Sequence, residues 1–152
     1  DTTGREIWDD TDGKVSAVVA SVGTAGTIRG ISDYVKGKNP DVKIVAVEPS
    51  ADDKYLTGIH NFTDVPAERV PVNIREKIYD EVFVAEKDGA FAAAQEVAKT
   101  DGVLVGISSG AALWGALQIA SRPEYEGKEI VVVLPDTGLR YLSTDLFKAQ
   151  KL

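Results

Sequence analysis

The segment "SVGTAGTIRG" at residues 21–30 holds the side chains and glycines best suited to bind a ligand. Gly23 and Gly26 allow the backbone to approach a ligand closely, and the hydroxyls of Thr24 and Thr27 add hydrogen-bond donors. A helix starting here would also offer free amides and its positive dipole end to an anion such as phosphate. The glycine spacing fits neither the dinucleotide fingerprint nor the P-loop. A phosphate site and a plain strand-to-helix turn are therefore both open at this point.

A second glycine turn, "GISSG" at residues 106–110, matches the G-x-S-x-G nucleophile elbow with Ser108 in the nucleophile position. That mechanism requires an acid and then a histidine later in the chain. The single histidine is His60, which precedes the turn, so this chain contains no such triad. Ser108 and Ser109 are expected to act as hydrogen-bond partners and helix caps. His60 is interpreted as a loop residue, and no metal site is expected.

The elements that position these turns alternate between strands and helices. Short, β-branched apolar runs predict strands at 14–21, 42–49, 81–86 and 128–138. Helices are predicted at 27–38, ended by Gly37, at 88–102, capped by Asp88 and ended by Gly102, and after the glycine turn within 103–121. A short helix capped by Asp1 or Thr2 is predicted to open the chain, and residues 51–81 to form a loop with one short helix near 73–79.

This alternation predicts an α/β fold, a doubly wound, mostly parallel sheet with helices on both faces. Ligands of such sheets bind beyond the carboxyl ends of the strands, where "VGTAGT" is expected to lie. The 152 residues are 43% hydrophobic, which fits one domain with its own core. The formal net charge of -7 disfavours nucleic acid and anionic membranes as partners and favours small, soluble ones.

The amino-acid composition narrows the classes of protein and the cellular locations that the sequence allows. No apolar run approaches the ~20 residues that span a bilayer, and the chain does not open like a signal peptide, so a cytoplasmic location is expected. Cysteine is absent, which excludes disulfides and a cysteine nucleophile within these residues. Methionine is absent too, so a chain starting at Asp1 is expected to be trimmed or excised from a longer protein.

Five segments, "DTTGREIW", "VASVGTAGTIRGI", "VKIVAVEP", "GVLVGISSGAA" and "IVVVLPDTGLRYLSTDLF", together resemble the C-terminal half of cysteine synthase (O-acetylserine sulfhydrylase), a family that uses pyridoxal 5'-phosphate (PLP). By this resemblance, Gly23, Thr24, Ala25, Gly26 and Thr27 match the G-T-G-G-T loop that holds the PLP phosphate, with Ala25 replacing a glycine. Ser108 matches the serine that hydrogen-bonds the pyridine nitrogen.

The resemblance implies the large-domain part of a fold-type II PLP enzyme, a homodimer when complete, that converts O-acetylserine and sulfide to cysteine and acetate. Residues 1–152 are then its cofactor-binding part. The family's Schiff-base lysine lies in the N-terminal half, so no catalytic residue is assigned here, Lys38 included, and this piece alone is expected to be inactive. Residues 58–73 replace the family's glycine-rich segment, and Leu139 stands where glutamate is frequent.

Three alternatives stay open from the sequence. One is a cystathionine β-synthase-like enzyme with a different nucleophile. The second, supported by the missing lysine, is a non-catalytic α/β module that binds a phosphate-bearing ligand or a partner chain. The third is a hydrolase using Ser108, which lacks a base.

Overall fold

Four parallel strands form the centre of the protein. The computed structural model describes residues 2–147. Its strands are β1 (Val15–Ser21), β2 (Lys43–Pro49), β3 (Glu81–Ala85) and β4 (Glu129–Val132), in the spatial order β3-β2-β1-β4. Every pairing is parallel, which confirms the predicted sheet. The fourth strand is shorter than the sequence predicted: only its first residues pair with β1, and Pro135, which has no amide hydrogen, follows shortly afterwards.

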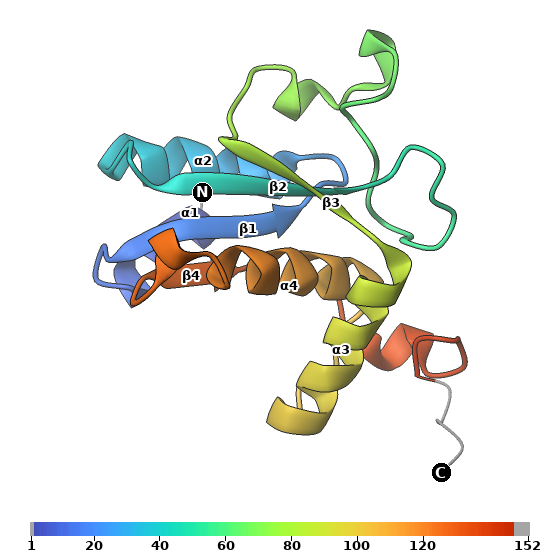
Figure 1. Ribbon diagram of the computed structural model, residues 1–152. Helices are drawn as coiled ribbons and strands as arrows, with labels where there is room; N and C mark the ends of the chain where they lie inside the picture. The colour runs from blue at the N-terminus through green and yellow to red at the C-terminus, as the bar shows by residue number, and fades with distance from the viewer. Residues whose placement is uncertain (1, 148–152) are drawn as a thin grey trace.

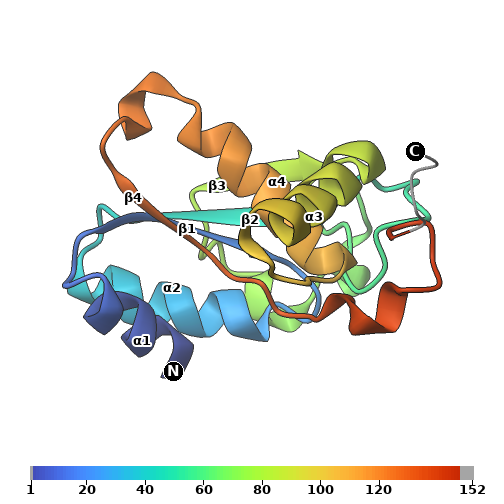
Figure 2. The same cartoon turned by 90° about the horizontal axis from the view of Figure 1, so that it is seen from below.

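Two helices cover each face of this sheet, as Figures 1 and 2 show. The helices α1 (Thr2–Asp10) and α2 (Gly26–Lys38) lie together on one face, and α3 (Lys87–Asp101) and α4 (Ile107–Ala120) on the other. The central strands β1 and β2 are therefore buried on both sides, as their unbroken apolar sequences predicted. Each face has its own hydrophobic core, one built around Ile28 and Ile31 of α2 and the other around Ala111 and Ile119 of α4.

The predictions for the helix ends were only partly correct. Gly102 ends α3 in a left-handed conformation with φ of 68°, as predicted. Gly37 instead lies inside α2, which ends at Lys38: Asn39 is the C-cap, with extended backbone and an amide that still bonds to the Val35 carbonyl. Asp88 does not cap α3, because that helix begins one residue earlier, after Glu86.

The caps of the other two helices also differ. Ser108 and Ser109 do not cap α4, because Gly106 occupies the capping position and the helix begins at Ile107. Thr2 lies within α1 rather than before it, and Asp1 falls outside the described residues. Polar side chains were expected at these ends, but neither Gly106 nor Glu86 forms a side-chain cap hydrogen bond.

The long connection from β2 to β3 contains no α-helix. The helix expected near 73–79 is wrong: the structure has two 3₁₀ turns, Ala67–Arg69 and Val72–Ile74, followed by irregular chain. The 3₁₀ turns each follow a proline, Pro66 and Pro71, whose fixed φ suits the start of a turn. Figure 1 shows this connection in green, extending beyond the sheet on the side of β2 and β3.

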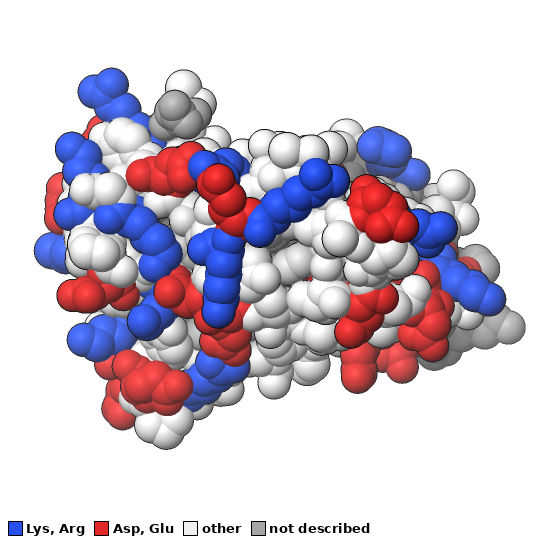
Figure 3. All heavy atoms as spheres, turned by 90° about the horizontal axis from the view of Figure 1, so that it is seen from above, with Lys and Arg blue, Asp and Glu red and all other residues white. Residues whose placement is uncertain are grey.

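Two surface features complete the description of residues 2–147. None of the helices in that range is long and apolar enough to cross a membrane, and the same range holds no cluster of three metal-binding side chains. On the face seen in Figure 3, basic and acidic side chains are interspersed, and neither sign forms one continuous patch.

Candidate functional site: a pocket at the carboxyl ends of the strands

The order of the strands creates a crevice beside β1. The chain leaves β1 toward β2 and β3 on one side and later returns to β4 on the other side. The loops that follow β1 and β4 therefore diverge, which is the position at which doubly wound proteins bind ligands. A pocket of about 210 Å³ lies here, lined by residues 23–28 after β1 and by Pro135 after β4. Ser21, Gly58 and Ser108 complete its wall.

All six residues selected from the sequence line this one pocket: Gly23, Thr24, Ala25, Gly26, Thr27 and Ser108. The two segments are more than 80 residues apart in the chain. They meet because each begins a helix at the same edge of the sheet, α2 directly after β1 and α4 after an irregular apolar stretch. Ser109, by contrast, does not line the pocket but is fully buried behind it.

The glycine loop presents backbone amides without protein acceptors. The first helical hydrogen bond of α2 runs from the Arg29 amide to the Ala25 carbonyl, so the amides of residues 23–28 donate to no acceptor among the described residues. No side chain caps this helix end either. The unpaired amides and the helix dipole together make the loop an anion-binding site by the chemistry of its donors.

The backbone of this loop is strained at one position. Ala25 adopts a left-handed conformation with φ of 63° and ψ of 11°, which suits glycine better than alanine. The Ala25 methyl is nevertheless accommodated, since the residue is only 4% exposed and packs in the core on the α2 face. Alanine therefore keeps the loop's amide donor and retains the left-handed turn at an energetic cost.

Ser108 supplies the second observation that points to a ligand. The residue is only 7% exposed, yet its hydroxyl bonds to no protein group within residues 2–147. Residues 2–147 hold no buried side-chain polar atom without a partner, so this hydroxyl is open to the pocket, where a polar ligand group could pair with it. Ser109 behaves differently: its hydroxyl and amide bond to the Asp136 carboxylate at 2.5 and 3.0 Å. That carboxylate fixes the first turn of α4 and with it the position of Ser108.

Among residues 2–147, no ionisable side chain lines the pocket. Its lining consists of glycine, alanine, serine, threonine, isoleucine and proline. The residues with clearly shifted pKa values do not line it: Arg29 lies on α2, paired with Asp33 and Glu76, and the others lie near the amino ends of β2 and β3. There the hydrogen bond from Arg122 lowers the pKa of Glu81, at an oxygen-to-nitrogen distance of 2.5 Å. This pocket can bind and orient a ligand, but it cannot transfer a proton with its own side chains.

Three contributors to the site were not predicted from the sequence. Gly58 lines the pocket with φ of 88°, and its carbonyl lies 3.0 Å from the position a Cβ on Gly23 would take. Pro135 lies opposite, after β4. Asn73 donates a hydrogen bond of 3.1 Å to the Thr24 carbonyl. Gly58 and Asn73 stand at the two ends of residues 58–73, which by the resemblance replace the segment that lines the family's active site, but neither residue was singled out, and nothing in the sequence pointed to Pro135.

A buried carboxylate holds the segment that carries Gly58. Glu48, at the end of β2, is fully buried and accepts hydrogen bonds from the amides of Phe62 and Thr63 at 2.7 and 3.2 Å. The Thr63 hydroxyl bonds to the same carboxylate. The amide of His60 bonds to the Val22 carbonyl at 2.8 Å, directly before the glycine loop. His60 is thus a loop residue, as predicted, and its backbone ties the segment to β1.

The fold and the pocket place this chain in the doubly wound α/β class, with a pocket whose amide and hydroxyl donors suit an anionic ligand. Comparison with known proteins gives the family. Residues 1–136 match the family described as pyridoxal-phosphate dependent enzyme, so the chain belongs to that family.

Among curated relatives, it is 41% identical to cysteine synthase A of Escherichia coli (strain K12) over 157 residues, which cover 96% of this chain and 49% of the relative. It is 44% identical to cysteine synthase of Haemophilus influenzae over 160 residues, covering 97% and 50% of the two chains. The chain thus spans about half the length of the curated relatives it matches.

Solved structures agree with this assignment. O-acetyl serine sulfhydrylase isoform 3 from Entamoeba histolytica superposes with a TM-score of 0.83 at 41% identity, covering 98% of this chain and 45% of that one. O-ureido-L-serine synthase superposes with a TM-score of 0.79 at 33% identity, covering 95% and 47%. These likenesses confirm the predicted fold and the predicted family.

Proposed function

We propose that this chain is the PLP-binding part of a longer enzyme that carries out β-replacement on an O-activated serine, as cysteine synthase does. The observation that carries the proposal is the pocket: unpaired amides of the glycine loop and the unpaired Ser108 hydroxyl converge there. Bound PLP would supply an electron sink for negative charge at the substrate α-carbon. The amides of residues 23–27 would hold its phosphate.

Ser108 would set the chemistry at the ring nitrogen. Its hydroxyl is neutral, and no carboxylate lines the pocket. A neutral partner disfavours a protonated ring and so weakens the electron sink, which favours elimination and replacement at the β-carbon over transamination. The described lining of the pocket holds no ionisable side chain, and the resemblance to cysteine synthase puts the lysine that binds PLP and moves the substrate proton in the N-terminal half of the complete enzyme.

The test uses the full-length protein that contains this chain. Added PLP should give the visible absorbance band of lysine-bound cofactor, and the loaded protein should convert O-acetylserine and sulfide to cysteine. Thr27→Val removes one hydroxyl from the loop and should weaken PLP binding several-fold. Thr3→Val, an equally exposed change on α1, should not. A wild-type protein that shows no such band would refute the proposal.

The nucleophile is the part of the proposal most in need of a direct assay. O-ureido-L-serine synthase shares the fold, and its name gives a product other than cysteine. Residues 58–73 also differ from the glycine-rich segment that the cysteine synthase family has at this place. Sulfide should therefore be compared with homocysteine, using O-acetylserine and serine as the amino-acid substrates. Preference for serine and homocysteine would favour the cystathionine β-synthase-like alternative.

We further propose that the complete enzyme is a cytoplasmic homodimer with a small-molecule amino-acid substrate, without a nucleic-acid or membrane partner. The resemblance to cysteine synthase supports the dimer, and the interspersed surface charges argue against a polyanion-binding face on the side shown in Figure 3. Light scattering of the full-length protein measures its mass directly. A monomer at micromolar concentration would contradict this part of the proposal.

A further inference from the structure

The irregular chain before β3 runs along one side of α2, and we name residues 73–80 the strap. Three of its contacts fall on helix residues spaced three and four apart, which places them on one face of α2. The pairs, with their distances, are Glu76 to Arg29 at 2.8 Å, Ile78 to Ser32 at 2.6 Å and Asp80 to Lys36 at 2.8 Å. The fourth, Asn73 to Thr24 at 3.1 Å, reaches the glycine loop before the helix.

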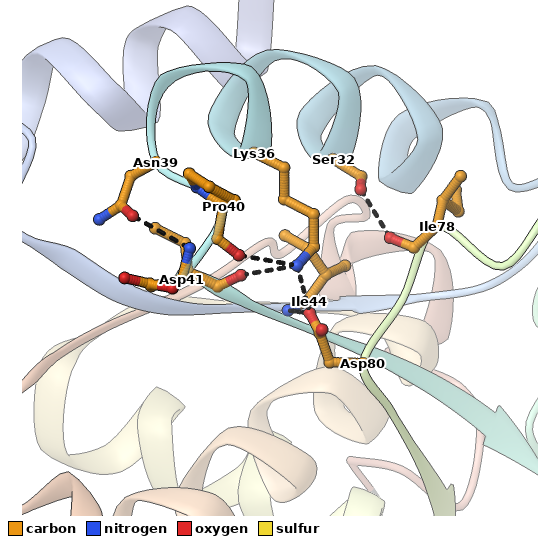
Figure 4. A network of polar contacts seen from close by, with 9 residues as sticks. Ser32, Lys36, Asn39, Pro40, Asp41, Ile44, Ile78 and Asp80 are labelled. Atoms are coloured by element: carbon orange, nitrogen blue, oxygen red, sulfur yellow. Dashed lines mark hydrogen bonds and ion pairs between the residues drawn. The ribbon is translucent and has the colours of Figure 1, made fainter.

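The end of the strap nearest β3 is firmly anchored, as Figure 4 shows. The Ser32 hydroxyl, in a residue only 3% exposed, donates to the Ile78 carbonyl. The Lys36 ammonium contacts the Asp80 carboxylate and the Val42 carbonyl, at 2.8 and 3.0 Å. Asp80 also accepts the amide of Ile44 in β2 at 2.8 Å. The strap is thus fixed to both α2 and the sheet, and its other end has a defined position.

That other end holds one peptide group of the glycine loop. Ile74 is buried in the core beneath α2, which fixes the backbone beside Asn73. The Asn73 amide then bonds to the Thr24 carbonyl. In a trans peptide the carbonyl and the following N–H point in opposite directions. Fixing the Thr24 oxygen therefore fixes the direction of the Ala25 N–H, an amide that has no protein acceptor within residues 2–147.

This contact matters because the loop does not hold itself in place. Ala25 is in a conformation that alanine disfavours, and no side chain caps α2. We propose that Asn73 is a positioning residue for the cofactor phosphate: through the Thr24 carbonyl it directs the Ala25 amide of the pocket. The inference rests on the proposed function, because it takes the loop to be the PLP phosphate site.

The test compares two ligands that differ only in the phosphate. Apo full-length protein is titrated with PLP and with pyridoxal, for the wild type, Asn73→Ala and the control Glu76→Ala. Asn73→Ala should weaken PLP binding about five- to tenfold, the range for losing one oriented hydrogen bond, and leave pyridoxal binding unchanged. Glu76→Ala truncates a strap side chain that is 78% exposed and pairs away from the loop, so it should change neither.

A second variant distinguishes the loss of this hydrogen bond from a loss of folding. Asn73→Asp keeps the side-chain volume but replaces the donating amide with a carboxylate, so it should weaken PLP binding more than Asn73→Ala does. The phosphorus-31 NMR signal of bound PLP should shift in both variants and not in Glu76→Ala. Equal losses for PLP and pyridoxal, or no loss for PLP, would overturn the role of Asn73. Wild-type protein that fails to bind PLP would instead overturn the proposed function.

Discussion

The left-handed conformation of Ala25 permits a quantitative test of the glycine loop. An alanine at φ of 63° stores about 1–2 kcal/mol of strain, which Ala25→Gly would release. Glycine also makes the unfolded chain more flexible, which costs about 0.4–1 kcal/mol. Loss of a methyl that is only 4% exposed costs about 0.8 kcal/mol more. These terms nearly cancel, so Ala25→Gly should change the free energy of unfolding by less than about 1 kcal/mol.

Two matched variants isolate the strain from the other terms. Ala94→Gly removes an equally buried methyl from the middle of α3, where there is no left-handed strain to release, and should cost about 1.5–2 kcal/mol. Gly102→Ala introduces the strain at φ of 68° with no atom within 4 Å of the new Cβ, and should cost about 1 kcal/mol. Urea denaturation measures all three. If Ala25→Gly were as destabilising as Ala94→Gly, the reasoning about strain would be wrong.

Three further outcomes are expected. Ser108→Ala should reduce PLP affinity about two- to tenfold without lowering the thermal midpoint of the apo protein, because its hydroxyl has no protein partner within residues 2–147. Gly106→Ala should destabilise the protein by more than about 2 kcal/mol in urea, since its Cβ would lie 1.9 Å from the Asp136 carboxylate. The pKa of Asp80 is lowered because the bonds from Lys36 and the Ile44 amide outweigh burial. The ionised Asp80 side chain should therefore stabilise the folded protein above its unfolded-state pKa of about 4. This stabilisation should be lost as the pH falls through the lower pKa that Asp80 has in the folded protein. Asp80→Asn should remove that part of the acid dependence in urea titrations between pH 2 and 5, and an unchanged profile would contradict this assignment.

The central strands and the helices were predictable because their sequences carry the burial pattern directly. The runs "VSAVVAS" and "KIVAVEP" are apolar on both faces, as a strand between two helix layers must be. The capping predictions failed because they assumed that a polar side chain caps each helix. The N-cap residues are Ala25, Glu86 and Gly106, and none of them forms a side-chain cap hydrogen bond, so a search for polar caps assigns those helix ends to the wrong residues.

The candidate site could be predicted only as far as its two helix ends. The glycine loop and Ser108 were found because each follows an apolar run and precedes a helix, which places both at one edge of a parallel sheet. Asn73 could not be found in the same way. It lies 49 residues from Thr24, in chain without periodicity, and its contact depends on the strap following α2. Such a contact becomes visible only when the tertiary structure is known.

The assembly of the pocket has a consequence for folding kinetics. Its wall includes Ser21, residues 23–28, Gly58, Ser108 and Pro135, and Pro135 reaches it only after β4 has paired with β1. The earlier half of the sheet can form from nearby sequence, whereas that last pairing closes a loop of over 100 residues. A ligand in the pocket therefore binds to contacts that form late in folding and not to those of the folding nucleus. Binding should slow the unfolding of the protein and leave its rate of folding almost unchanged.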